Sequence, residues 1–375
     1  MARIKSCGLI GLLLVLGMCS SSFGWGHQGH ILITRLAALR IIHDPNAPPG
    51  LREFLRRAEP YSMEDCRDLA LYDTVGLNVQ REQKYDQGLD HWCTWPDQLR
   101  YLPQGHDHIE PYGVGEDKMH YMDLEVFGPE PVYRDDLSNK PDVNRIAHDL
   151  NDPRWRRAGF VPWRVEEMYH RLADDFGAGP GIAQPDQALI DAGFLAHYVE
   201  DSTQPQHATV DYNSLSYLIG RIPQLPASAN PETTGMAAIR LPHGINPHGD
   251  FEFQLFESAS GPRAAFRQEY WSELLRDIDV IDADRAEPTV SSFNPFRWDL
   301  HILSSSYDAL PFIGYATQAA YAQDYFDAPT YFRFRGRAFG REMDTVQLIA
   351  LQNAKAVADV ELVYRLAWHL GRRER

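Results

Sequence analysis

The chain has 375 residues, of which 44% are hydrophobic, and it carries a formal net charge of −16. This length suits one large domain or two modest ones with a buried core. Because so negative a surface repels polyanions at long range, we do not expect stable binding of duplex nucleic acid.

Residues 1–24 have the pattern of a secretory signal peptide. Arg3 and Lys5 precede an apolar run at 8–18, and small residues follow just before Trp25. The run is about half of the roughly 20 residues that a bilayer span needs, and no later stretch is long and uncharged enough to cross one. We predict cleavage before Trp25 and a secreted or periplasmic protein without a transmembrane segment.

The cysteines depend on this processing. A lipid anchor on Cys19 is not favoured, because Met18 before it is larger than that processing normally accepts. Signal cleavage removes Cys19 together with Cys7. The remaining pair, Cys66 and Cys93, is then in a compartment where disulfides persist. We predict a bridge between these two, with two free thiols as the alternative.

Hydrophobic residues recur at helical spacing along the chain and period-two alternation is scarce, so we predict a mainly α, multi-helical fold with long loops. The predicted helices are 29–42, 51–58, 161–175, 184–200, 251–278 and 336–370. The predicted loops are 44–50, 103–115, 127–141, 223–247 and 283–296. Loops longer than about 15 residues are uncommon in a compact domain unless something holds them, and metal ligation is one way to do so.

Two histidine–carboxylate pairs have a spacing that suits metal ligation. His197 and Asp201 are four residues apart at the end of a predicted helix, so they share one face of it. A proline ends that helix and lets His207 turn back toward the same place. His248 and Glu252 repeat the four-residue spacing. Such a pair can bind one ion, although it also occurs as a solvated helix contact.

Three upstream stretches complete a family pattern. They read Trp25-Gly-His-Gln-Gly-His30, Trp95-Pro-Asp97-Gln-Leu-Arg100 and Met119-His120-Tyr121-Met-Asp123. With the two pairs, they make residues 25–257 resemble the zinc-dependent phospholipase C and single-strand-specific nuclease superfamily, in which processing exposes an N-terminal tryptophan. The signal peptide places the mature N-terminus at the same residue. Residues 258–375 match nothing in that family, and we expect a helical C-terminal extension packed on the core.

The resemblance implies a centre of three zinc ions (Zn²⁺). The implied ligands are Trp25 (amine and carbonyl oxygen), His30 and Asp201 for one ion, Asp97, His120, His197 and Asp201 for its neighbour, and His207, His248 and Glu252 for the third. Asp201 would bridge the first two ions. The alternatives are a buried aromatic role for Trp25 and a capping role for His30.

Such a centre predicts hydrolysis of phosphate esters. Zinc lowers the pKa of bound water toward about 7, and two ions about 3.5–4 Å apart can place a hydroxide in line with phosphorus. We expect Asp201 to hold the two ions that share this water and Asp97 to orient the water and take its proton. The third ion would neutralise a phosphate oxygen or the leaving alkoxide.

The substrate stays open between two kinds of phosphodiester. Asn246 and the stretches 25–30 and 95–100 resemble the nuclease branch, whereas Glu252 and the stretch 207–217 resemble the phospholipase C branch. The Gly-Gly-Asn loop of the nucleases is missing. We favour a phospholipase C-like hydrolase of phospholipid head groups, with a nuclease or 3′-nucleotidase acting on single-stranded nucleic acid as the alternative. A noncatalytic, zinc-stabilised binding protein is the alternative of another class.

Two residues are candidate substrate contacts. Tyr121, beside His120, would stack on a base or line an acyl groove, with core packing as the alternative. Asn246 precedes His248 by two residues. Arg100 is expected to contact either Asp97, a phosphate or a surface acid.

Overall fold

The computed structural model describes residues 25–58, 62–72, 88–102, 109–128, 140–178, 185–223, 244–256, 264–284, 288–322 and 325–373, with the single residues 225, 228, 239 and 241. These residues are mainly helical, as predicted. The predicted signal peptide, 1–24, lies outside the described residues. None of the described helices combines the length and the hydropathy that a membrane span requires.

The helices are α1 (Gly26–His43), α2 (Pro49–Ala58), α3 (Met63–Leu71), α5 (Leu89–Leu99), η1 (Glu116–Met119), η2 (Leu124–Phe127), η4 (Val143–Arg145), α7 (Trp155–Ala158), α8 (Val161–Gly177), α9 (Pro185–Thr203), η5 (Pro205–Ala208), α10 (Leu215–Leu218), α12 (Pro247–Glu252), α13 (Ala264–Asp284), α14 (Pro295–Tyr307), α15 (Leu310–Ala320), α16 (Ala328–Arg333) and α17 (Thr345–Arg373). The η elements are 3₁₀ turns. Strands β1 (Arg335–Ala338) and β2 (Arg341–Asp344) form an antiparallel hairpin.

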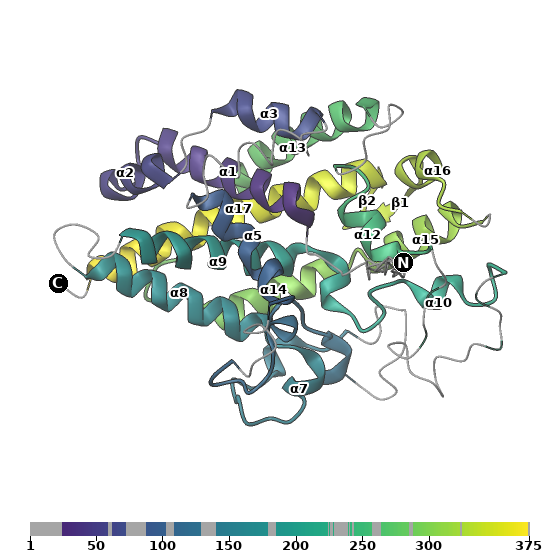
Figure 1. The fold of residues 1–375 in the computed structure, drawn as a ribbon, viewed down its shortest axis with the longest axis horizontal. Helices are drawn as coiled ribbons and strands as arrows, with labels where there is room; N and C mark the ends of the chain where they lie inside the picture. Colours follow the sequence, from purple (N-terminus) through teal and green to yellow (C-terminus); the bar gives the residue numbers. More distant parts are fainter. Residues whose placement is uncertain are drawn as a thin grey trace, which may run out of the picture.

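Helices from both halves of the chain surround α9. The long helix α17 packs against α1, α8, α9 and α13, while α5 and α8 pack on α9 from other sides (Figure 1). Because neighbours cover α9 almost all round, it is apolar or buried on every face rather than on one stripe. The C-terminal helices share one hydrophobic core with the N-terminal ones, so they complete the enclosure of α9.

Two of the predicted helices are wrong in extent. The stretch 251–278 is divided between α12 and α13, with a turn at 253–256 after α12. The stretch 336–370 begins as the hairpin, because Phe339 and Gly340 both have positive φ, which turns the chain back on itself. α17 starts only at Thr345, where the Asp344 carboxylate accepts a hydrogen bond from the Gln347 N–H.

The predicted disulfide is also wrong in this structure. In the described part of the chain, Cys66 on α3 and Cys93 on α5 are both buried, and they are not joined by a bridge. The Cys93 thiol is directed along its own helix, where it donates to the Asp90 carbonyl oxygen at 3.3 Å.

A glycine sets how closely α5 approaches α9. A Cβ on Gly193 would lie 2.6 Å from the carbonyl carbon of Trp92 and 2.8 Å from the amide nitrogen of Cys93. The two backbones are in contact there. This contact fixes Asp97 on α5 relative to His197 and Asp201 on α9.

We therefore predict that Gly193→Ala destabilises the protein by about 1–3 kcal/mol, because overpacking outweighs the gain in helix propensity. Urea unfolding followed by circular dichroism would measure it. The control Asp186→Ala, on the exposed first turn of α9, should cost less than about 1 kcal/mol. Equal stability of the Gly193→Ala and unaltered proteins would contradict the close contact.

Candidate metal centre

The structure brings all eight predicted side-chain ligands together in the interior. They come from α1, α5, the end of η1, α9, η5 and α12, and none is more than 4% exposed. Their donor atoms form three groups, in each of which the atoms lie within 4.8 Å of one another. The groups are His30, His197 and Asp201; Asp97, His120 and His197; and His207, His248 and Glu252.

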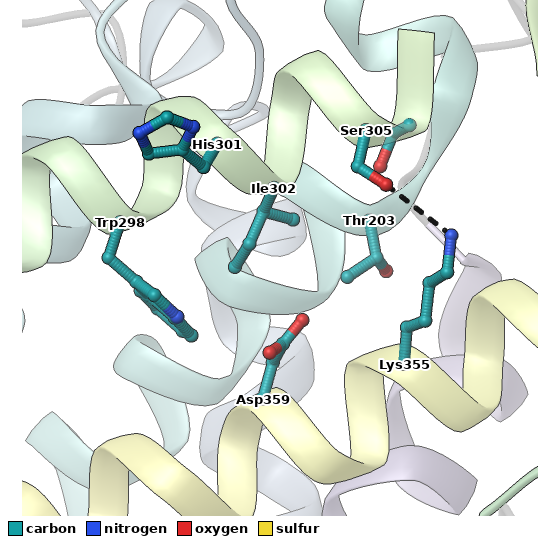
Figure 2. A pocket seen from close by; sticks show the side chains of 8 residues that line it. Thr203, Trp298, His301, Ile302, Ser305, Lys355 and Asp359 are labelled. Carbon is teal, nitrogen blue, oxygen red and sulfur yellow. Dashed lines mark hydrogen bonds between the residues drawn. The ribbon is translucent and has the colours of Figure 1, made fainter. Parts of the chain in front are cut away.

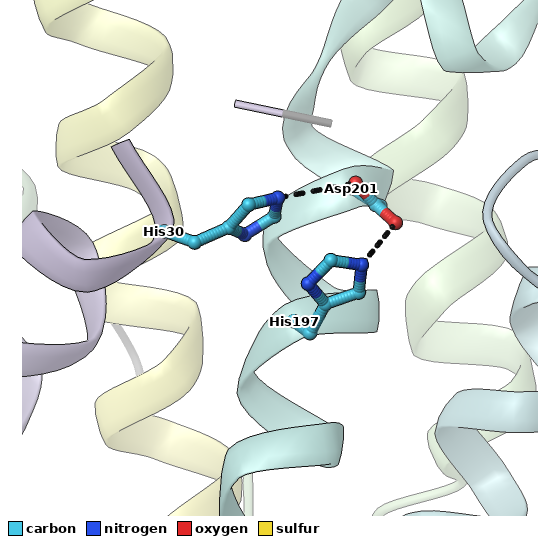
Figure 3. A group of neighbouring side chains, drawn as sticks. All are labelled: His30, His197 and Asp201. Carbon is cyan, nitrogen blue, oxygen red and sulfur yellow. Dashed lines mark ion pairs between the residues drawn. The ribbon is translucent and has the colours of Figure 1, made fainter. Parts of the chain in front are cut away.

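Asp201 lies between the groups. Its Oδ1 is 3.7 Å from His30 Nε2 and 3.5 Å from His207 Nδ1. Its Oδ2 is 2.9 Å from His120 Nδ1 and 3.2 Å from His197 Nε2. Figure 3 shows His30 on α1 and the His197 ring on α9 approaching the two different oxygens of this carboxylate. Each oxygen thus faces a different set of imidazoles, which is the arrangement that a bridging ligand requires.

Asp97 faces the same centre from α5. Its Oδ1 is 3.8 Å from His120 Nδ1 and 3.9 Å from His197 Nε2, and its Oδ2 is 4.0 Å from His30 Nε2. Arg100, one turn further along, contacts Asp97 directly. Although burial opposes ionisation of Asp97, the Arg100 charge holds the pKa of this carboxyl below its usual value.

The third group lies beside the first two. Glu252 Oε1 is 2.5 Å from His248 Nε2 and 3.3 Å from His207 Nε2. The Gln204 side-chain amide donates to the same oxygen at 2.7 Å and so orients Glu252. Asn246 caps α12 by accepting a hydrogen bond from the Gly249 N–H at 3.3 Å. The cap begins the short helix that places His248 and Glu252 one turn apart.

The hydrogen bonds of three histidines leave Nε2 directed at the centre. The Nδ1 atoms lie 2.5 Å from Glu200 Oε2 for His30, 2.7 Å from the Cys93 carbonyl oxygen for His197, and 2.8 Å from the His120 carbonyl oxygen for His207. Metal-binding histidines usually have the second ring nitrogen held in this way.

Several donor atoms have no hydrogen-bond partner although they are buried. They are His30 Nε2, Asp97 Oδ2, His120 Nε2, Asp201 Oδ1, His248 Nδ1 and Glu252 Oε2. Leaving a buried polar atom unsatisfied costs about 1–3 kcal/mol, so such a cluster is rare without a ligand. Imidazoles and carboxylates are the donors that zinc binds. The residues present therefore fit the metal that the family resemblance implied.

Trp25, the ninth predicted ligand, is a buried aromatic residue beside the centre. Its indole N–H is 2.9 Å from the Glu200 carbonyl oxygen and 3.0 Å from Thr203 Oγ1, at the end of α9. Its ring packs on Phe251 of α12 with centroids 5.5 Å apart. These contacts hold Trp25 against the end of α9 that carries Asp201.

Two orienting residues were missed from the sequence. Glu200 accepts a hydrogen bond from Thr34 Oγ1 at 2.7 Å and holds His30, while Gln204 holds Glu252. Glu200 directly precedes Asp201 in the sequence. Its side chain is directed at His30 and Thr34 on α1, which becomes clear only once α9 is placed against α1. Gln204 is a neutral residue in a turn, and no sequence signal marked it.

Burial and neighbouring charges shift the pKa values of the predicted ligands in different directions. Although burial lowers it, the pKa of His197 is raised to about 9 by Asp201 and Asp97. Burial alone would raise the pKa of Asp201, but His197 and its neighbours hold it well below the usual value. Burial raises the pKa of Glu252 well above the usual value. At neutral pH His197 therefore carries a proton that a metal ion would displace, and burial favours the protonated form of Glu252.

A cavity of about 570 Å³ adjoins the centre and is lined by His120, His207 and His248 together with residues that bind no metal in our assignment. Tyr121 lies in this lining, and its contact with substrate stays a prediction. Asn246 does not line it and instead caps α12, so its predicted substrate contact is not supported. Arg100 lines the cavity and also contacts Asp97.

A second cavity, of about 210 Å³, lies between α14 and α17 (Figure 2). Lys355 projects into it from α17, within 3.5 Å of Ser305 Oγ. Burial lowers the pKa of Lys355 to about 8, against the opposing effect of Asp359. None of the predicted ligands lines this cavity, so it is separate from the centre.

No protein-family profile matches the chain, and no curated protein matches it either.

We predict that protein starting at Trp25 and purified with zinc contains about three zinc ions per chain, and that a chelator lowers its melting temperature. Asp201→Asn should remove about two ions and Glu252→Gln about one, because Asp201 lies between two groups. Elemental analysis by mass spectrometry measures this. Asp142→Asn, an exposed acid, is the control. The reverse order of loss would contradict the bridging role.

We also predict that zinc binding releases protons and strengthens as the pH rises toward about 9. The raised pKa of His197 stabilises the metal-free protein below about pH 6.5, and that contribution is lost as the pH passes 9. Zinc needs the deprotonated ring, so the two equilibria oppose each other. Calorimetric titration at pH 7.5 in two buffers of different ionisation enthalpy gives the proton count. If no protons are released at pH 7.5, zinc binding does not displace the proton of His197.

Proposed function

We propose that this protein is a zinc-dependent hydrolase of phosphate esters. The observation that carries the proposal is the convergence of three buried groups of metal-binding side chains, one of them sharing His197 with another, beside a cavity. Zinc ions in such a centre activate water for attack on phosphorus and neutralise charge on the phosphate oxygens. The resemblance to the zinc-dependent phospholipase C and nuclease superfamily supports the same reaction.

The chain's own residues have distinct roles in the proposed reaction. Trp25, His30 and Asp201 would hold one ion, Asp97, His120, His197 and Asp201 its neighbour, and His207, His248 and Glu252 the third. Asp97 is kept ionised by Arg100, so it can accept a proton from the attacking water. Arg100 also lines the cavity, where its guanidinium can orient the phosphate.

The substrate is a phosphodiester, and two sources are proposed. The sequence favoured a phospholipid. The cavity lining supports single-stranded nucleic acid as a second candidate, because Tyr121 and Tyr212 offer rings on which a base can stack and the Lys118 ammonium and Arg100 guanidinium can meet its backbone. A noncatalytic zinc-held binding protein is the outcome in which zinc binds but no ester is cleaved.

We predict that zinc-loaded protein starting at Trp25 hydrolyses bis(p-nitrophenyl) phosphate, and that a chelator abolishes this activity. Asp97→Asn should lower kcat by roughly 100-fold or more, because it removes both a ligand and the proton acceptor. Release of nitrophenolate measures the rate, with Asp142→Asn as the control. Phosphatidylcholine and single-stranded DNA, assayed in parallel, separate the two sources. Full activity in metal-free protein would refute the proposal.

A further inference from the structure

The large cavity has a surplus of positive charge in an otherwise acidic protein. Four cationic side chains line it, namely Arg100, Lys118, Arg156 and Arg157, against two acids, Asp117 and Asp123. Burial raises the pKa of Asp123 well above its usual value, which favours its uncharged form. The chain as a whole carries −16, so this concentration of cations is a local exception.

These cations come from three elements of the fold. Arg100 contacts Asp97 and so belongs to the metal centre. Arg156 and Arg157 stand on α7, and Lys118 stands on η1 with its Nζ 2.5 Å from the Tyr121 hydroxyl. Positive charge therefore extends along the cavity beyond the point where the scissile phosphate would meet the metals.

The α7 arginines are attached rigidly to the segment that carries His120. The Asp123 N–H donates to the Ala158 carbonyl oxygen at 2.7 Å, and the Phe160 N–H donates to the Lys118 carbonyl oxygen at 2.7 Å. Gly159 has φ of +98°, and a Cβ there would collide with the Tyr121 carbonyl group, whose carbon would be 3.0 Å away. The backbone of α7 is thus held in a fixed position relative to the segment that carries His120.

We propose that Arg156 and Arg157, together with Lys118, form a subsite for a second phosphate group carried by the substrate next to the scissile ester. The inference rests on the proposed phosphoesterase function and specifies its substrate class. A cavity of about 570 Å³ is larger than one phosphate needs, and two arginines with a lysine supply cationic hydrogen-bond donors for an additional phosphate. The second phosphate belongs either to a neighbouring nucleotide or to a phosphorylated lipid head group.

The test compares matched substrates with and without the extra phosphate. One arm uses the dinucleotide dTpdT against its 5′- and 3′-phosphorylated forms. The other uses phosphatidylinositol against its 4-phosphate in vesicles of otherwise the same composition. Each rate is expressed relative to hydrolysis of bis(p-nitrophenyl) phosphate by the same protein. We expect the extra phosphate to raise kcat/KM about three- to tenfold in one arm and less so at high salt.

The double variant Arg156→Ala/Arg157→Ala should lose this preference. The control Arg154→Ala, an exposed arginine that pairs with Asp152 and does not line the cavity, should keep it. Preference in the dinucleotide arm identifies a nucleic-acid source, and preference in the lipid arm a head-group source. No preference in either arm, or a preference that survives the double variant, overturns the proposal.

A binding measurement distinguishes failure of the proposed subsite from failure of the proposed hydrolase function. Calorimetric titration of zinc-free protein with the phosphorylated and plain dinucleotides needs no catalysis. Tighter binding of the phosphorylated form, lost in the double variant, supports the subsite even if no ester is cleaved. The opposite result has three parts: the zinc-free protein binds the two forms equally, the zinc-loaded enzyme is active, and it shows no kinetic preference. That result would refute the subsite and leave the proposed hydrolase function standing.

Discussion

The Asp201 carboxylate, enclosed by four imidazoles, is the interaction on which the rest of the structure depends. Its two oxygens face different pairs of histidines, all buried. Burying this many polar donors, several without a hydrogen-bond partner, is costly, and bound metal is the compensation that fits the donor set. A fold selected only for stability would fill this volume with apolar side chains.

The helical framework follows from that requirement. α9 carries His197 and Asp201 and must be covered on every side to exclude water from them. The N-terminal helices α1 and α5 supply His30 and Asp97 while covering two sides, and the C-terminal helices α14 and α17 cover others. The extension beyond residue 257 therefore has a physical role in enclosing α9, although it contributes no predicted ligand.

Hydrophobic periodicity predicted the central helices well. The elements and contacts that it missed depend on tertiary packing. The four-residue spacing of His197 and Asp201 survives in α9, which was predicted as a helix over 184–200 and spans Pro185–Thr203. α5 was missed because Pro96 inside it indicates a break, yet its tertiary contacts with α9 keep it helical. The residues that orient the ligands, Glu200 and Gln204, are visible only once α9 is placed against α1 and α12. The cysteine pairing failed because spacing along the sequence cannot show where a thiol is directed.

The central claim is that nine donors, including the main chain of Trp25, assemble into one trinuclear centre. Anomalous diffraction at the zinc absorption edge, from crystals of protein starting at Trp25, tests it most directly. The account predicts three peaks, two of them flanking Asp201 and one of these also bound by the Trp25 amine. The same protein with one alanine before Trp25 should lose or weaken that peak alone. Absence of anomalous peaks around Asp201 in zinc-soaked crystals would contradict the account.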